Sequence, residues 1–166
     1  MEQAVHEATN TQTLKGIFRT LTSEHRDLVR LLKRLCSTSE TEVRSLLFPT
    51  LRVQLIGHER GEMEVLYPAL RSRGLTYGMA EQHDDSARKL EVLVGCLSGY
   101  SFDHPGWGEA AESLLAVFEQ HVGEEETEFF ALAQEAIGAE RAEELDEQYE
   151  ACKLRLEQSE QSERAV

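Results

Sequence analysis

The stretch HERGEMEVLYPAL, residues 58–70, contains the pattern on which the fold and the function depend. Its helix carries an apolar stripe at helical spacing, formed by Leu51, Leu55, Val65 and Ala69. His58 and Glu62 fall on this same stripe, four residues apart, so both side chains face the core together with the apolar ones. Since burying an unpaired carboxylate costs several kcal/mol, such a pair requires a partner.

Apolar stripes with a period near 3.6 residues recur along nearly the whole chain. Besides the helix that contains residues 58–70, they predict helices over about 13–37, 77–98 and 106–136, and a weaker one over 139–158. Four long stripes joined by short or moderate loops favour an antiparallel, up-down-up-down four-helix bundle. The predicted fold class is therefore all-α, with an additional C-terminal helix that lies against the bundle or against a partner chain.

The chain of 166 residues is expected to form one domain. We divide it into a flexible N-terminal tail (1–12), the bundle (13–136), the C-terminal helix (139–158) and a frayed tail (159–166).

The composition is strongly acidic, with 31 Asp and Glu against 17 Lys and Arg and a formal net charge of -14. Nucleic acid and anionic membrane surfaces are poor partners for such a chain, because both require a basic patch. The N-terminus does not resemble a secretory signal, and no apolar run approaches the roughly 18 residues of a membrane span. Three distant cysteines without a CxxC motif, Cys36, Cys96 and Cys152, predict buried thiols and a cytoplasmic location.

Each predicted bundle helix has one histidine on its apolar stripe: His25, His58, His83 and His121. Two of these histidines are followed four residues later by a glutamate, Glu62 and Glu125. Residues i and i+4 lie on one helical face, about 6 Å apart along the axis, so each pair can serve one shared site. A single core histidine usually has a structural role. Four of them, with two carboxylates and no Lys or Arg on the same stripes, predict a buried cation site.

The donor types narrow the choice of metal. Four imidazoles and two carboxylates exceed the ligand set of one tetrahedral zinc, and they include no thiolate. Imidazole with carboxylate suits iron or manganese, and carboxylates that bridge through both oxygens favour two ions. The Glu-x-x-His signature of ferritin-like di-iron proteins does not occur around these histidines, where the order is His-x-x-x-Glu. A structural role, with zinc or with no metal, is the alternative.

Four segments together resemble the hemerythrin-like, or HHE cation-binding, domain: EHRDLVRLL (24–32), HERGEMEVLYPAL (58–70), EQHDDSARKL (81–90) and EQHVGEEETEFF (119–130). The resemblance covers about residues 13–136, and the histidines and His-x-x-x-Glu pairs follow the order of that family. It implies a non-haem centre of two iron ions with an oxo or hydroxo bridge. By position, it implies that Glu62 and Glu125 bridge the ions and that the terminal ligands are His25, His58, His83 and His121.

The sequence departs from the oxygen-carrying hemerythrins at two positions. Ala87 stands where they have a fifth histidine, four residues after His83, and Glu125 replaces an Asp that follows its histidine at a spacing of five. The chain thus resembles the four-histidine branch, which includes iron and oxygen sensors, nitric-oxide-responsive proteins and peroxide-handling proteins. A missing imidazole leaves a more open centre, which favours redox chemistry or sensing over oxygen storage.

From this resemblance we expect a protein that binds or reacts with dioxygen, peroxide or nitric oxide, in oxygen handling or under oxidative or nitrosative stress. Catalase-like breakdown of peroxide is one such activity. The alternative is an iron or oxygen sensor, or an iron donor, that acts through a partner. The C-terminal helix would then contact that partner or a second copy of the chain.

Other polar residues lie near the predicted ligands. Glu59, Glu81 and Glu128 could each be an extra ligand or an acceptor that orients a histidine, although a solvated surface charge is the commoner role. Glu59 is the first candidate among them. We expect Tyr67 to pack against Pro68 rather than to reach the site.

Overall fold

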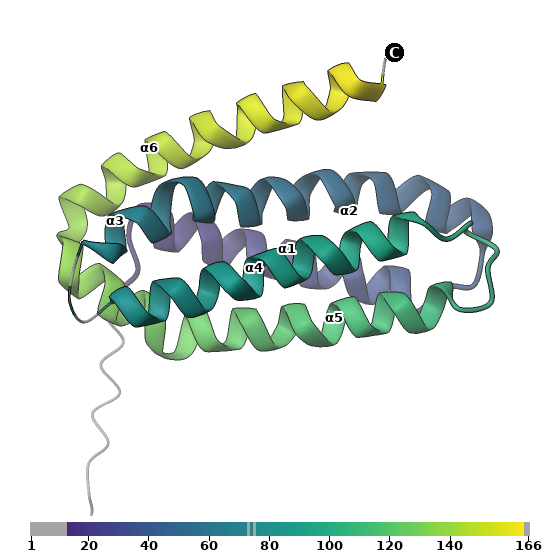
Figure 1. The fold of residues 1–166 in the computed structure, drawn as a ribbon, viewed down its shortest axis with the longest axis horizontal. Coiled ribbons are helices and arrows are strands. Elements are labelled where there is room, and N and C mark those ends of the chain that lie inside the picture. The colour runs from purple at the N-terminus through teal and green to yellow at the C-terminus, as the bar shows by residue number, and fades with distance from the viewer. Residues whose placement is uncertain (1–12, 73, 75, 165–166) are drawn as a thin grey trace, which may run out of the picture.

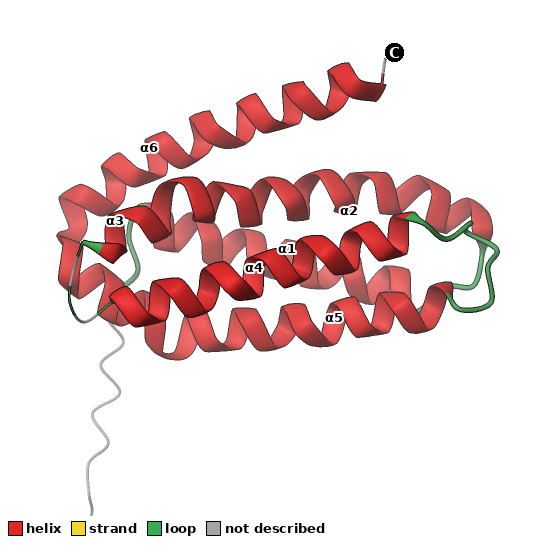
Figure 2. Cartoon of the chain, in the orientation of Figure 1, coloured by secondary structure: helices red, strands yellow, loops and turns green. Residues whose placement is uncertain are grey.

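The computed structural model describes residues 13–72, 74 and 76–164, and this part of the chain contains helices and no strand (Figures 1 and 2). The elements are α1 (Ile17–Cys36), α2 (Thr41–Gly61), η1 (Glu62–Leu66), α3 (Tyr67–Arg71), α4 (Tyr77–Ser98), α5 (Trp107–Glu124), η2 (Glu125–Phe129) and α6 (Phe130–Arg164). The prediction of an all-α bundle with an additional C-terminal helix is confirmed. The predicted tail 1–12 lies outside the described residues.

Four rods form the bundle. The first is α1, the second runs without interruption through α2, η1 and α3, the third is α4, and the fourth passes through α5 and η2 into the start of α6 (Figure 1). Their apolar stripes meet in two clusters. One surrounds Leu32, Leu51 and Trp107 near one end, and the other surrounds Phe18, Tyr67 and Phe129 near the other end. In the sequence, His25, His58 and His121 each lie between a residue of one cluster and a residue of the other.

The sequence predicted α-helix throughout the two rods that carry His-x-x-x-Glu, and this prediction is wrong at one turn of each rod. Each contains one π-helical turn, and each π-turn begins at the glutamate of the pair, Glu62 in η1 and Glu125 in η2. Adjacent residues of a regular helix point about 100° apart. The wider π-turn changes this register. Two adjacent large side chains follow each glutamate and are fully buried: Leu66 and Tyr67, and Phe129 and Phe130.

Gly138 divides α6 into two helical parts. Its φ of 80° lies in the left-handed region, which glycine adopts without steric strain. The chain turns there, and the second part of α6 crosses back along α1 and α2 before diverging from the bundle (Figure 1). Ala142, Leu145 and Tyr149 bury this part against the bundle. The helix continues to Arg164, beyond residue 158, where we expected it to end in a frayed tail.

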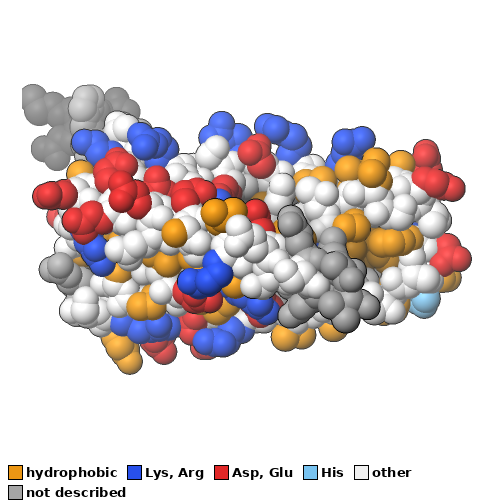
Figure 3. Space-filling model, turned by 90° about the horizontal axis from the view of Figure 1, so that it is seen from above, with side chains coloured by type: hydrophobic (Ala, Val, Ile, Leu, Met, Phe, Trp, Pro, Cys, Tyr) orange, Lys and Arg blue, Asp and Glu red, His pale blue; other side chains and the backbone are white. Residues whose placement is uncertain are grey.

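The surface on the side of α6 mixes acidic and basic side chains (Figure 3), although the net charge is strongly negative. Among the described helices, none has a stretch long and apolar enough to cross a membrane. The expectation of three buried thiols is wrong for two of them. Cys152 is buried, Cys36 is half-buried and Cys96 is exposed, since Cys96 lies off the core stripe of its helix.

A close approach between α2 and α6 predicts the effect of one substitution. A Cβ atom at Gly61 would lie 2.4 Å from Cε2 of Tyr149, whereas a Cβ at Gly57 would meet nothing within 4 Å. Gly61→Ala is expected to lower the free energy of unfolding of the metal-free protein by about 1–3 kcal/mol, measured by urea denaturation, because it overpacks this contact. The matched control Gly57→Ala should stabilise by up to about 1 kcal/mol. Equal effects of the two changes would contradict the described packing.

Candidate metal centre

The six residues predicted as metal ligands lie together inside the bundle, and two of them, Glu62 and Glu125, are the first residues of the π-turns. Each side chain is at least 97% buried, with His83 the most exposed at 3%. They come from four rods: His25 from α1, His58 and Glu62 from the second, His83 from α4, and His121 and Glu125 from the fourth.

One half of the centre is formed by His25 and His58. Nε2 of His25 lies 3.2 Å from Oε2 of Glu125, and Nε2 of His58 lies 3.8 Å from Oε1 of Glu62. The two rings are in edge-to-face contact, with centroids 4.9 Å apart. We call His25, His58 and the carboxylate oxygens that face them half-site 1. His25, His58 and Glu62 have donor atoms within 4.8 Å of one another, which is compact enough to surround one cation.

The other half is formed by His83 and His121, and we call it half-site 2. Nε2 of His121 lies 3.5 Å from Oε1 of Glu125 and 3.7 Å from Oε2 of Glu62. Nδ1 of His83 lies 3.8 Å from the same Glu125 oxygen. Glu62 and Glu125 therefore each direct one carboxylate oxygen to half-site 1 and the other to half-site 2. This is the arrangement that a carboxylate bridge between two cations needs.

Glu59 is part of half-site 2. Its side chain is fully buried, and Oε2 lies 3.4 Å from Nε2 of His121. Together with Glu62 and His121 it makes a third compact group of donor atoms. For this residue the commoner role of a solvated surface charge is ruled out by burial. Half-site 2 thus has one carboxylate more than half-site 1.

The inward atoms of the centre lack hydrogen-bond partners in the structure. Buried polar atoms normally have hydrogen-bond partners, and a group of them without partners indicates a bound ion or a functional role. Here they converge on one place: Nε2 of His25, His58 and His121, Nδ1 of His83, both oxygens of Glu59, Oε1 of Glu62 and Oε2 of Glu125. In the described part of the chain, the ion-pair partners of the three carboxylates are histidines alone. The donor set fits cations bound at its middle.

Three of the four histidines are held from behind through Nδ1. Nδ1 of His58 lies 2.9 Å from Oε2 of Glu24, and Nδ1 of His25 lies 2.8 Å from Oε1 of Glu126. Nδ1 of His121 lies 3.1 Å from the Ser86 hydroxyl. An Nδ1–H that donates to a carboxylate leaves Nε2 as the lone-pair donor, which is the tautomer that a metal-binding histidine needs.

Sequence reasoning missed these outer partners. Glu24, Ser86 and Glu126 each lie off the core stripe, and helical spacing within one rod does not show which residue of a neighbouring rod will reach a histidine. Glu24 and Glu126 are each adjacent to a ligand in the sequence, which is the only signal available. The candidates Glu81 and Glu128 are not at the centre: Glu81 forms an ion pair with Arg71, and Glu128 is exposed.

Tyr67 corrects another expectation. Its hydroxyl lies 2.9 Å from Oε2 of Glu62 and 3.0 Å from Oε1 of Glu125, and donates to these carboxylates. The side chain is fully buried. The π-turn of η1 places this residue inward, so that it contacts both bridging carboxylates instead of packing only against Pro68.

Phenylalanines enclose the centre. Phe129 stacks on His83 with centroids 4.5 Å apart, and Phe130 stacks on His25 at 5.7 Å. Phe118 meets the edges of His25 and His58. Apolar walls of this kind exclude water and strengthen every electrostatic interaction within them.

Without a cation, protons balance the charge of the centre. Burial raises the pKa of Glu59 to about 7, and the nearby Glu62 and Glu125 carboxylates add to this effect against the opposing charge of His121. Burial alone would lower the pKa of His25, but the adjacent carboxylates of Glu125 and Glu126 outweigh burial and raise the pKa to about 10. Burial would raise the pKa of Glu125, but His121, His25 and His83 lower it to about 2.

Three comparisons place the chain among known proteins. The sequence profile described as the Hemerythrin HHE cation binding domain matches residues 16–133. A crystal structure of a hemerythrin HHE cation binding domain-containing protein from Mycobacterium kansasii superimposes with a TM-score of 0.69 at 24% identity, over 84% of this chain and 86% of that one. A protein of Nostoc sp. named DNA nickase is 26% identical over 113 residues, which are 67% of this chain and 31% of that protein. The chain thus spans less than a third of the length of this relative.

The retained protons predict how metal binding depends on pH. A metal ligand must be deprotonated, so a cation displaces the proton of His25 below a pH of about 10 and also that of Glu59 below a pH of about 7. We expect the affinity for ferrous iron, measured anaerobically by chelator competition, to rise with pH and to rise more steeply below about pH 7 than above it.

The variant Glu59→Gln cannot hold the second proton. Its affinity should be lower than that of the native chain at pH 8, and the steeper dependence at lower pH should be weaker. An affinity of the native chain that is equal at pH 6 and pH 8, after correction for the chelator, would contradict this account.

Proposed function

Because this chain belongs to the family of hemerythrin HHE cation-binding domains, we propose that its buried centre holds two iron ions and that the protein binds or reacts with dioxygen, peroxide or nitric oxide. The observation that carries the proposal is the pair of carboxylates, Glu62 and Glu125, each with one oxygen at either half-site. Two histidine pairs joined in this way fit two cations better than one. Imidazole and carboxylate donors without thiolate favour iron.

In this proposal His25 and His58 hold one ion and His83 and His121 the other. Glu62 and Glu125 bridge the two, and Glu59 adds a donor at half-site 2. The extra carboxylate makes the two positions unequal, since the described part of the chain places no corresponding residue at half-site 1. A small exogenous ligand would therefore have more room at half-site 1, beside His25 and His58.

Bound iron would supply redox equivalents and an open coordination position for a small ligand. The chain's own side chains supply the surroundings. Glu24 and Glu126 orient His58 and His25 by accepting from Nδ1–H, and the phenylalanines exclude bulk water. The Tyr67 hydroxyl donates to the two bridging carboxylates and so helps to fix their orientation.

We assign the chain to the four-histidine branch, and this assignment supports reactivity over storage. Ala87, four residues after His83, is fully buried and offers no donor atom where oxygen carriers have an imidazole. We infer that the protein reduces or decomposes its ligand, with peroxide as the first candidate, or that it senses the ligand. Release of iron to another protein would require weak retention, and the buried, outer-supported ligands argue for strong retention.

Metal content is the first test of this proposal. Protein purified anaerobically and loaded with ferrous iron should retain about two ions per chain, and His58→Ala or Glu125→Ala should reduce the content and the metal-dependent gain in thermal stability. His104→Ala is the matched control, because this loop histidine is exposed and distant from the centre. Its iron content and melting temperature should equal those of the native chain.

Other results of the same measurement would contradict the proposal. One zinc per chain, or no metal after anaerobic loading, would show that the stripe histidines have a structural role. Unchanged stability of both variants would exclude metal binding by these residues.

Peroxide turnover tests the chemical part. The iron-loaded protein should decompose hydrogen peroxide with release of oxygen gas, followed with an oxygen electrode, and Glu125→Ala should abolish this activity because it removes a bridging ligand. Glu128→Gln, on the exposed side of η2, is the control and should retain full activity. If the native protein holds iron but releases no oxygen, peroxide decomposition is excluded, and binding of nitric oxide to the reduced protein becomes the next assay.

A further inference from the structure

Helix α6 reaches the metal centre from outside the bundle. Tyr149 on this helix is fully buried, and its hydroxyl donates to Oε2 of Glu24 at 2.5 Å. The same hydroxyl lies 3.1 Å from Nδ1 of His58, and Glu24 Oε2 lies 2.9 Å from that nitrogen. The three side chains thus form a triangle behind a ligand of half-site 1. Tyr149 lies beyond residues 16–133, the part that the family profile matches.

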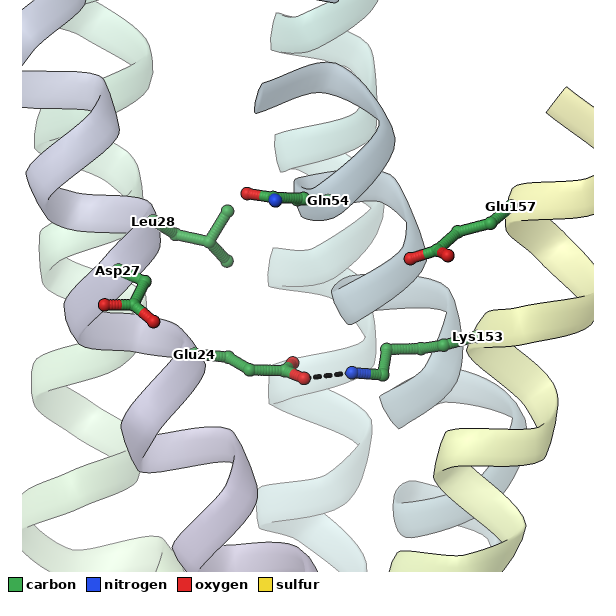
Figure 4. Close-up of a pocket in the computed structure, with 6 residues that line it drawn as sticks. All are labelled: Glu24, Asp27, Leu28, Gln54, Lys153 and Glu157. Atoms are coloured by element: carbon green, nitrogen blue, oxygen red, sulfur yellow. Dashed lines mark hydrogen bonds and ion pairs between the residues drawn. The ribbon is translucent and has the colours of Figure 1, made fainter. Parts of the chain in front are cut away.

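Lys153 adds a second link from α6, one turn after Tyr149. Its ammonium group forms an ion pair with Oε1, the other carboxylate oxygen of Glu24 (Figure 4). It also lies 4.8 Å from the centroid of the Tyr149 ring, within the range of a cation–π interaction. Both oxygens of Glu24 are therefore occupied, one by His58 and Tyr149, the other by Lys153.

A pocket of about 180 Å³ lies beside this ion pair, between α1, α2 and α6 (Figure 4). Its lining residues are Glu24, Asp27, Leu28, Gln54, Lys153 and Glu157. Among the described lining residues, Lys153 is the one cation, and it faces three carboxylates. At this level α6 is therefore held to α1 by a polar link beside open space, not by close apolar packing. Beyond it, α6 diverges from the bundle (Figure 1).

The bundle has a matching space for the tyrosine ring. Gly61 stands between His58 and Glu62 in the sequence. Because it has no side chain, the Tyr149 ring fits against it, and an added Cβ would lie 2.4 Å from Cε2 of that ring. The ring also meets the imidazole of His58 edge to face, with centroids 6.4 Å apart. Docking of α6 thus depends on the same segment that holds the centre.

We propose that α6 is a part of the metal centre, in which Tyr149 and Lys153 position Glu24 and, through it, His58, so that metal binding and docking of α6 stabilise each other. Tyr149 is a positioning residue in this account and not a ligand. The proposal rests on the proposed function, because it requires His58 to bind a metal ion.

The coupling follows from the geometry. His58 donates its Nδ1–H to Glu24 only while Glu24 keeps its orientation, and two of the contacts that fix this orientation come from α6. A bound ion fixes Nε2 of His58, which in turn fixes Glu24 and the docked helix. By thermodynamic reciprocity, an undocked helix weakens binding of the ion to the same extent. Occupancy of a buried centre would thereby change the exposure of a surface helix, which is the property that a sensor needs.

The test compares Tyr149→Phe with Tyr100→Phe. Each change removes one tyrosine hydroxyl, but Tyr100 is a partly exposed loop residue. Iron-loaded native protein and both variants are mixed with excess ferrous chelator under anaerobic conditions, and iron release is followed by absorbance. Tyr149→Phe should release iron at half-site 1 about tenfold faster than the native chain, as expected for loss of an outer partner of a ligand. Tyr100→Phe should match the native chain.

Hydrogen exchange of the amides of residues 145–156 gives a readout independent of metal release. Loading with iron should slow this exchange in the native chain and in Tyr100→Phe, and should slow it much less in Tyr149→Phe. Lys153→Met should behave as Tyr149→Phe does, whereas Lys153→Arg, which keeps the charge, should restore native behaviour. Circular dichroism of each variant shows whether the bundle is folded. If Tyr149→Phe does not fold, the comparison of Lys153→Met with Lys153→Arg provides the test.

The two levels of the proposal fail in different ways. A native chain that binds no iron would overturn the proposed function and this inference with it. The coupling alone would be overturned by a different result. The native chain would bind iron, Tyr149→Phe and Lys153→Met would release it at the native rate, and loading would leave the exchange of residues 145–156 of the native chain unchanged.

Discussion

The burial of three carboxylates in one place is the constraint on which the rest of the structure depends. Glu59, Glu62 and Glu125 lie inside the bundle with histidines as their only ion-pair partners in the described part of the chain. Such a group is strongly unfavourable in a dry interior unless positive charge neutralises it. Protons do so in part when no metal is bound, which is why the pKa values of His25 and Glu59 are raised. Cations would do so more completely, and the number, type and direction of the donors suit them.

The two π-turns are a local solution to the same constraint. In a regular helix, the stripe that holds His58 and Glu62 would continue through Val65 and Ala69. The π-turn instead places two adjacent residues on the core side, so that Tyr67 contacts the bridging carboxylates and Phe129 and Phe130 cover two histidine rings. The same order, His-x-x-x-Glu followed by two adjacent buried residues, occurs in both rods. Coordination and the exclusion of water are thus obtained from one short segment of sequence, used twice.

Helical periodicity was sufficient to predict the four rods and to identify which polar residues share a face with the apolar stripe. It could not reveal contacts between rods, because the rotation and register of each helix against its neighbours arise from packing. Glu24 and Ser86 were missed for this reason, and Tyr149 also, since it belongs to a helix outside the bundle. The π-turns were missed because apolar residues stand at both registers: Val65 and Ala69 continue the stripe of a regular helix, whereas the structure buries their neighbours Leu66 and Leu70. Tyr67 was then assigned to packing, since a regular helix would not have turned it to the centre.

The two half-sites differ in a way that connects the chemistry to the surface of the molecule. Half-site 2 has the additional donor Glu59, and among the described residues no hydrogen bond or ion pair from α6 supports its histidines. Half-site 1 has fewer donors, and one of its ligands, His58, is oriented through a triangle that includes Tyr149 of α6. The position with more room for an exogenous ligand is thus the position whose geometry depends on the additional helix. A ligand that displaces or reorients His58 would change its contact with Glu24 and, through Glu24, the ion pair with Lys153. This ion pair lies at the edge of a pocket where α6 begins to diverge from the bundle. Reaction at the centre and a signal at the surface are therefore compatible roles for this chain, because both would act through the same histidine.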